Sequence, residues 1–181
     1  MTFKYTALAC SLAAALALTA CGNDDKATTA TDNATPATSD KTLTVVTPWE
    51  ITNADPSTSG FVYQHMGIGE TLVDVDDKGA IIPALAEKWE TADNGKTWVF
   101  TLRDDVKFHD GTPMTAKEVV NSLTLALNKP TALESANIQL IKAIDDKTVE
   151  FQLDEPLTTL PSYLAHATAI ILAPASFDDK G

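Results

Sequence analysis

The sequence predicts a globular part that mixes helices and strands throughout, of the α/β or α+β class. Two stretches, 98–102 and 149–153, alternate apolar and polar residues with the period of two that a half-buried strand requires. Between them, Thr115 and Glu118 have the spacing of a capping box, and an apolar stripe at helical spacing follows as far as Leu127. Strands and an amphipathic helix in one segment exclude an all-helical or an all-β domain.

The N-terminal half of the globular part is predicted to alternate strands, turns and short helices. Residues 42–49 are β-branched and apolar and predict a strand that ends at Pro48, and residues 51–60 predict a polar loop. A turn at residues 93–96, with a glycine where a positive φ is needed, directly precedes the strand at 97–103. The elements expected between the loop and this turn are a helix at 61–72, a hairpin at 72–79 and a short helix at 83–89.

The C-terminal half is predicted to be organised around the amphipathic helix. This helix begins after the Thr115 cap, carries Glu118 in its first turn and ends at residues 128–130, where a proline stops it. The wholly apolar run 169–173 predicts a further strand, which Pro174 terminates. The other expected elements are a turn at 110–111, a turn at 145–147 and a short helix that begins near Pro161.

The composition excludes several classes of partner. The chain has 181 residues, with 13 Lys+Arg against 25 Asp+Glu and a formal net charge of −12. Nucleic acid and anionic lipid surfaces both require a positive field, so neither is an expected partner. A hydrophobic fraction of 44% is too high for a disordered acidic chain, and two cysteines are too few for a disulfide scaffold or a four-cysteine zinc site.

The first twenty residues are expected to be a lipoprotein signal peptide. Lys4 precedes an uncharged apolar stretch, 5–20, which is short for a membrane span and suits a secretory signal. The stretch ends in Leu18-Thr-Ala-Cys21-Gly22, which resembles the lipobox of bacterial lipoproteins, whose cysteine is diacylated before the signal is cut in front of it. We therefore expect residues 1–20 to be removed and Cys21 to carry the lipid; an ordinary cleaved signal and a buried core helix are the alternatives.

Residues 21–41 are expected to form a lipidated flexible tether. After Cys21 the segment consists mostly of Thr, Ala, Asp, Asn and Ser and has no large apolar residue, so nothing offsets the entropy lost on ordering. The globular part then covers residues 42–181. The acyl chains would hold the protein at a bacterial membrane without a transmembrane helix.

The sequence contains no motif that indicates an enzyme, a metal site or a cofactor. It has no HExxH, nucleophile elbow, phosphate loop or GxGxxG fingerprint. Residues 74–79 resemble the first half of a calcium loop, but Leu85 stands at the twelfth position, where a bidentate Glu is required. The three histidines are scattered along the chain, at His65, His109 and His166.

Trp49 is the first ligand-contact candidate from the residues alone. It follows Pro48 at the end of the first expected strand, and open α/β sheets bind ligands at the carboxyl ends of their strands. Three residues on the segment that follows are further candidates for lining a pocket: Glu50, Ser59 and Tyr63. The remaining large aromatics occupy strand or short-helix positions where core packing is expected, at Trp89, Trp98, Phe100 and Phe108.

Residues 83–120 resemble the extracellular solute-binding proteins of family 5, the peptide-, dipeptide- and nickel-binding subunits of ABC importers. The resemblance lies in Pro83-Ala-Leu-Ala-Glu-Lys-Trp-Glu90, in Asp93-Asn-Gly-Lys-Thr-Trp-Val-Phe-Thr-Leu-Arg-Asp-Asp-Val-Lys-Phe-His-Asp-Gly-Thr-Pro113 and in the capped helix after it. Upstream and downstream, Glu70-Thr-Leu-Val73 and Leu172-Ala-Pro174 look like segments of the same family. The resemblance implies the α/β class and a type II periplasmic-binding-protein fold, present incompletely, as part of the first lobe in an N-terminal fragment.

The resemblance also implies a function and a cellular location. It indicates a solute-binding subunit that captures a peptide or similar small solute for the permease, while a separate subunit hydrolyses ATP. The protein would lie on the periplasmic or cell-surface side of a bacterial membrane, held by its lipid. A nickel or metal-chelate carrier of the same family is one alternative, and a lipoprotein interaction or chaperone module without transport is another.

The resemblance associates two stretches with the ligand pocket. Nickel-chelate binders of this family carry Trp and Arg at the pocket, and the corresponding stretches here, 131–133 and 167–169, contain neither residue type. This disfavours a nickel chelate as the solute. His166, beside the second stretch, is a further ligand-contact candidate. Because family members close two lobes around the solute, this chain alone is expected to bind no solute tightly.

Overall fold

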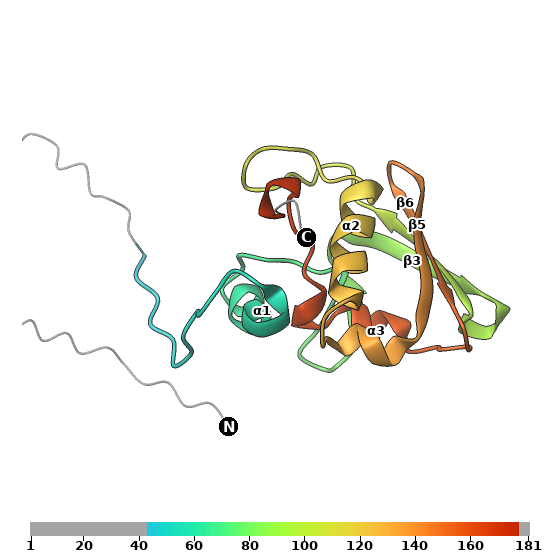
Figure 1. The fold of residues 1–181 in the computed structure, drawn as a ribbon, viewed down its shortest axis with the longest axis horizontal. Coiled ribbons are helices and arrows are strands. Elements are labelled where there is room, and N and C mark those ends of the chain that lie inside the picture. The colour runs from blue at the N-terminus through green and yellow to red at the C-terminus, as the bar shows by residue number, and fades with distance from the viewer. Residues whose placement is uncertain (1–42, 178–181) are drawn as a thin grey trace, which may run out of the picture. The chain divides into compact units, whose positions relative to one another are not determined.

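A computed structural model describes residues 43–177, and the elements below all belong to one unit, Val45–Gly181 (Figure 1). The predictions for residues 1–42 lie outside the described residues. They include the signal peptide, the lipidated Cys21 and the tether. Within residues 43–177, no helix has the length and apolar character that crossing a membrane demands.

A four-stranded antiparallel sheet forms the centre of the unit, with strand order β3-β4-β6-β5. In β4 and β6, every second residue is buried and the residues between are half-buried, which confirms the two alternating strands predicted from the sequence. Trp98 pairs with Phe151 and Phe100 with Val149 across these strands. The strands are β3 (Ala86–Ala92), β4 (Thr97–Leu102), β5 (Ile138–Asp145) and β6 (Thr148–Leu153).

Helix α2 (Ala116–Leu127) lies along one face of the sheet and closes the core (Figure 1). Its predicted cap is present, since the Glu118 carboxylate accepts a hydrogen bond from the Thr115 backbone N–H at 3.0 Å. Val119 and Leu123, from the predicted apolar stripe, are fully buried. The helix is therefore oriented by its apolar stripe, which packs against the sheet side chains.

Helix α1 (Pro56–His65) packs against the short 3-10 helix η3 (Ala167–Ala169). Asp55 is the N-cap of α1 and Pro56 stands in its first turn, an arrangement that favours a helix start at this point. The other elements are β1 (Val73–Val75), β2 (Ile81–Pro83), α3 (Leu160–Leu164), η1 (Asp93–Gly95), η2 (Ala132–Ala136) and η4 (Pro174–Ser176). The predicted hairpin, the turn at 93–96 and the helix near Pro161 are confirmed by β1–β2, η1 and α3.

The strand predicted over 42–49 is wrong for the described residues 43–49. They form no strand, and Leu43 and Val46 are 85% and 90% exposed. A strand is stable only when a neighbour pairs with its backbone, and within residues 43–177 no strand pairs with this segment.

The short helix predicted over 83–89 is also wrong. Pro83 ends β2, and residues 86–92 form β3, where Trp89 pairs with Phe100 of β4. The run of Ala, Leu and Glu favours a helix, but tertiary contacts outweigh this local preference. Pairing with β4 supplies backbone hydrogen bonds and packs the partly buried Trp89 against the core.

One helix boundary and two strands differ from the sequence predictions. The helix predicted over 61–72 begins earlier, at Pro56 inside the predicted loop, and ends at His65 before Gly67, whose φ is 66°. The run 169–173 is not a strand: Ile171 donates one backbone hydrogen bond to the Glu70 carbonyl, at 3.0 Å, and the run joins no sheet. Strand β5 was not predicted, because bulges on this edge strand interrupt its alternation.

Candidate functional site

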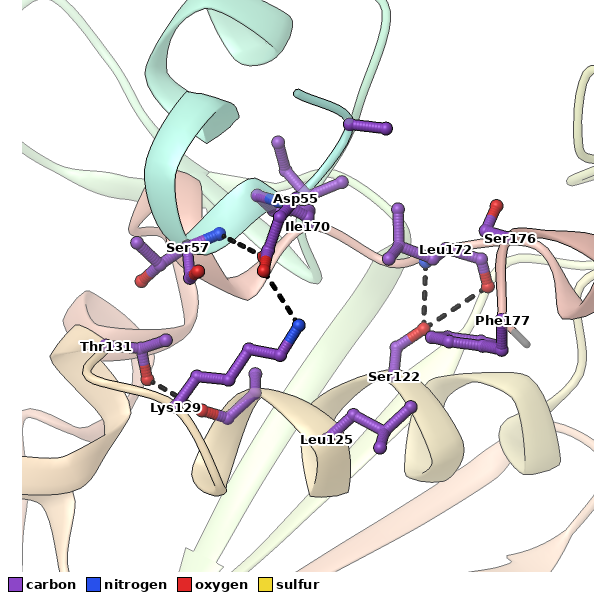
Figure 2. Close-up of a pocket in the computed structure, with 14 residues that line it drawn as sticks. Asp55, Ser57, Ser122, Leu125, Lys129, Thr131, Ile170, Leu172, Ser176 and Phe177 are labelled. Carbon is purple, nitrogen blue, oxygen red and sulfur yellow. Dashed lines mark hydrogen bonds and ion pairs between the residues drawn. The ribbon is translucent and has the colours of Figure 1, made fainter. Parts of the chain in front are cut away.

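A cavity of about 300 Å³ opens where three segments of the chain meet. They are the start of α1, the C-terminal half of α2 and the segment 168–177, as Figure 2 shows. Its walls combine apolar side chains with hydroxyl groups and one pair of opposite charges. The residues on which the argument below depends are Asp55, Ser122, Leu125, Lys129, Thr131 and Thr168.

The charged pair is formed by Asp55 and Lys129, which are 74 positions apart in the sequence. Lys129 Nζ lies 2.8 Å from Asp55 Oδ2, and the two side chains are 38% and 33% exposed respectively. Asp55 Oδ1 also accepts a hydrogen bond from the Ser57 backbone N–H at 2.9 Å, as the N-cap of α1. The pair thus joins the beginning of α1 to the residue that follows the C-cap of α2.

The carboxyl group of Asp55 is held in its ionised form. Partial burial raises the pKa of Asp55, while hydrogen bonds from Lys129 and Ser57 lower it by more, so the net pKa lies below its ordinary value. At neutral pH the cavity therefore contains one fixed anion and one cation, which neutralise each other.

Ser122 attaches the segment 168–177 to α2. Its hydroxyl accepts a hydrogen bond from the Leu172 N–H at 2.8 Å and donates one to the Leu172 carbonyl at 3.2 Å. Ser122 is buried, and it lies beside Leu172, which lines the same cavity (Figure 2). These two bonds satisfy backbone groups of a segment that has no strand partner.

The stretches 131–133 and 167–169, which the family resemblance associates with a ligand, meet at this cavity. The Ala132 N–H donates a hydrogen bond to Thr168 Oγ1 at 3.4 Å, across 36 positions of sequence. Thr131 Oγ1 donates to the Ala126 carbonyl at 3.0 Å, which fixes the first stretch against the end of α2. Thr131 and Thr168 both line the cavity.

The predicted contact residues near the N-terminus lie on other parts of the unit. Trp49 packs edge-on against Phe61, with ring centroids 5.0 Å apart, and is 47% exposed. Ser59 is buried inside α1, and Glu50 is exposed. None of these three predicted residues lines the 300 Å³ cavity.

Tyr63 and His166 line two further cavities. The Tyr63 hydroxyl donates to the Asn53 carbonyl at 2.6 Å, and its ring lines an apolar cavity of about 450 Å³. His166 Nδ1 accepts the Thr168 N–H at 3.2 Å, and the ring lines a cavity of about 510 Å³ together with His65. The structure does not gather the five candidate residues at one cavity, and their ligand contacts stay predictions.

Asp55 and Lys129 are the residues that sequence reasoning missed. Asp55 carries a local signal, because an Asp before a Pro is typical of a helix start, but Lys129 carries none. Within residues 43–177, no three His, Cys, Asp or Glu side chains are grouped in a way that could hold a metal ion.

Comparison with known proteins identifies the family. Residues 80–181 match the bacterial extracellular solute-binding proteins, family 5 Middle. The chain belongs to this family. Family 5 proteins serve ABC importers as solute-binding subunits, and several relatives of this chain are named as periplasmic binding proteins.

Relatives of this family 5 chain differ in the solutes named for them. The glutathione-binding protein GsiB of Pectobacterium atrosepticum is 31% identical over 144 residues, which cover 77% of this chain and 27% of that protein. The nickel-binding periplasmic protein of Escherichia coli is 35% identical over 120 residues, or 59% of this chain and 23% of that protein. The family 5 chain therefore spans about a quarter of the length of these relatives.

The solved structures confirm the predicted fold class. The binding protein AgaA of A. tumefaciens R10, in complex with agropinic acid, matches with a TM-score of 0.63 and 30% identity over 70% of this chain and 27% of that one. A nickel ABC transporter protein from Bacillus halodurans matches with a TM-score of 0.62 and 35% identity over 68% and 26%. The described residues of this family 5 chain form part of a type II periplasmic-binding-protein fold.

Proposed function

We propose that this chain is a solute-binding subunit of an ABC importer and that the 300 Å³ cavity contributes to its solute contacts. The solute would be a peptide or a similarly small molecule, which the protein hands to the permease. One observation carries the proposal: the stretches around Thr131 and Thr168 meet at this cavity, joined by the hydrogen bond between Ala132 and Thr168. Membership of family 5 supports the same function.

The lining of the cavity favours an organic solute over a metal chelate. Among residues 43–177, neither Trp nor Arg lines it, and its polar side chains are hydroxyls and one ion pair. Hydroxyl groups and apolar walls are suited to the amide, carboxyl and side-chain groups of a short peptide. The cavity at the start of α1 is therefore assigned to peptide-like solutes.

A metal-chelate carrier is the second candidate function. Two imidazole rings, His65 and His166, line the same 510 Å³ cavity, and imidazole nitrogen is a suitable ligand for nickel. The 35% identity to the nickel-binding protein of Escherichia coli supports this alternative. A nickel titration that broadens the His65 and His166 signals and leaves the Thr131 signal unchanged would favour it.

The N-terminal predictions belong to the same proposal. We assign residues 1–20 to a signal peptide, residues 21–41 to a tether lipidated at Cys21 and residues 42–181 to part of the solute-binding lobe. The lipid would keep the protein on the periplasmic or cell-surface side of the membrane, within reach of the permease. An interaction or chaperone module would use the same anchor but would bind no small solute.

The proposal is tested by nuclear magnetic resonance titration of the ¹⁵N-labelled 181-residue chain with glutathione and with a simple dipeptide. We expect amide shifts at Thr131, Thr168 and Ile170, with dissociation constants weaker than about 1 µM, since micromolar binding requires about 8.2 kcal/mol. Leu125→Trp fills the cavity and should abolish these shifts. Thr124→Trp, on the exposed side of α2, is the matched control and should leave them unchanged. Shifts that survive Leu125→Trp, or that occur only at other residues, would contradict the proposal.

A further inference from the structure

Among the residues that the structure describes, Lys129 is the one cation that lines the 300 Å³ cavity, and its ammonium group can form more hydrogen bonds than the one described below. An ammonium group carries three donors. Within the described part of the chain, the only hydrogen bond that Nζ makes is to Asp55 Oδ2, at 2.8 Å. Figure 2 shows the side chain extended from the end of α2 across the cavity toward Asp55.

Three of the five hydroxyl groups that line the cavity form hydrogen bonds with the backbone of the protein itself. Ser122 bonds both backbone groups of Leu172, Thr131 donates to Ala126, and Thr168 accepts from Ala132. These bonds hold the walls together, and a solute that used the same hydroxyls would have to compete with them. Lys129 is therefore the strongest donor that a solute can reach without breaking the fold.

One carboxylate oxygen of Asp55, Oδ1, keeps its hydrogen bond when Lys129 is displaced from Oδ2. Oδ1 accepts the Ser57 N–H at 2.9 Å, and the position of Asp55 at the start of α1 places it near the positive end of the helix dipole. Because both side chains of the pair are about one-third exposed, water can hydrate either charged group when the pair separates, and the separation costs little free energy. A second carboxylate can therefore approach Lys129 while Asp55 keeps its cap.

The walls beside Lys129 are apolar. Leu125, Ile170 and Phe177 line the cavity and are not exposed. A solute that placed a carboxylate on Lys129 would bury its carbon skeleton against these side chains, and apolar burial supplies most of the binding free energy of small solutes.

We propose that Lys129 selects solutes with a free carboxylate and that the cavity takes small carboxylates with a compact apolar body. This inference rests on the proposed function. It adds the chemical class of the solute and names Lys129 as the residue that recognises the solute carboxylate. Asp55 limits the affinity, because it competes with the solute for Lys129 and repels its charge.

The test uses three probes of equal chain length: hexanoate, hexanamide and hexylamine. The ¹⁵N-labelled 181-residue chain is titrated with each, and the amide signals of Thr131 and Ile170 report on the cavity. Hexanoate should shift both signals and the other two probes should bind at least about tenfold more weakly, the difference expected for one charge-assisted hydrogen bond.

Four variants assign the effect to the ion pair. Lys129→Met should weaken hexanoate binding about tenfold relative to the wild type. Lys129→Arg should bind hexanoate about as well as the wild type, because the positive charge is kept. Asp55→Asn should tighten binding by roughly threefold, because asparagine caps a helix as well as aspartate and brings no charge. Lys117→Met, an exposed lysine in the first turn of α2, is the matched control and should change nothing.

The outcomes separate this inference from the proposed function. If hexanamide binds as well as hexanoate and Lys129→Met is without effect, the cavity binds solutes but Lys129 does not select them, and the inference is overturned. If none of the probes shifts Thr131 or Ile170 in the wild type or in Asp55→Asn, the inference is also overturned. In both cases the peptide titration with Leu125→Trp still decides the proposed function.

Discussion

Gly60 of α1 lies directly against the backbone carbonyl of Ala167, so that a Cβ on residue 60 would stand 2.2 Å from the carbonyl oxygen. This contact brings α1 onto η3 and, with it, Asp55 to the edge of the cavity. The obstacle is backbone and not a flexible side chain, so only glycine permits the approach.

Gly60→Ala is expected to lower the free energy of unfolding by about 2 kcal/mol, because α1 must move away from η3 to accommodate the methyl group. Urea denaturation followed by circular dichroism measures the loss. Gly69→Ala is the matched comparison, since its Cβ would meet the Ile170 side chain at 2.8 Å and that side chain can rotate. A smaller loss for Gly60→Ala than for Gly69→Ala would show that the α1–η3 contact is not as close as described.

Ser122→Ala is expected to release the segment around Leu172 from α2. The substitution leaves the Leu172 N–H without its 2.8 Å bond and should lower the free energy of unfolding by about 1–2 kcal/mol. Hydrogen exchange of the Leu172 amide should become faster by about tenfold or more. Ser162→Ala, at an exposed position of α3, is the control for a lost hydroxyl. Unchanged protection of Leu172 in Ser122→Ala would contradict the assigned bond.

The ion pair of Glu150 with Lys142 is expected to make the free energy of unfolding depend on pH in the acidic range. Its carboxylate lies 2.7 Å from Lys142 Nζ, in register across β5 and β6, and hydrogen bonds from Lys142 and Gln152 lower its pKa. A lowered native pKa contributes stability above the pKa of the unfolded chain, near 4.3, and this stability is lost as the pH falls through the native value. Glu150→Gln should reduce stability at pH 7 by about 0.5 kcal/mol, since the pair is in contact with water, and should match the wild type near pH 2.

Denaturation curves of both proteins between pH 2 and 7 check this prediction. The parent and Glu150→Gln should differ most at neutral pH and converge on acidification. A constant difference across the whole range would assign the effect to packing or to the new amide and would exclude the ionised pair as its cause.

Cys21→Ser is expected to abolish lipid attachment when the 181-residue chain is produced in bacteria. The acyl chains contribute roughly 0.8 kcal/mol for each buried CH₂, so the wild type should enter the detergent-rich phase in detergent partitioning and the variant should stay in the aqueous phase. Cys10→Ser provides the control, because residue 10 would be removed with the signal. Equal partitioning of the wild type and Cys21→Ser would refute the lipid assignment.

Local patterns were sufficient to predict β4, β6 and α2. The alternation in β4 and β6 and the capped stripe of α2 are correct because each depends on residues a few positions apart. The errors at 43–49 and 86–92 have the opposite cause. A strand forms only where a second strand pairs with it. Within the described part of the chain residues 43–49 have no such partner, whereas Trp89 pairs with Phe100, and neither fact can be predicted from the residues adjacent in sequence.

The candidate site was predictable only in part. The resemblance to family 5 singled out the stretches at 131–133 and 167–169, and both reach the cavity. Trp49 is a candidate only because it ends an expected strand, and that strand does not form in the described residues. The pairing of Asp55 with Lys129 could not be predicted, since ion pairs between residues 74 positions apart leave no local pattern.

The sequence by itself determined the α/β class, the central strands, the capped helix and membership of a solute-binding family, because periodicity, caps and long motifs are properties of neighbouring residues. Only the tertiary structure decided where the cavity lies and which charges line it. It did so because Gly60 permits α1 to contact η3 and Ser122 attaches Leu172 to α2, and these two contacts between distant segments bring Asp55 to Lys129.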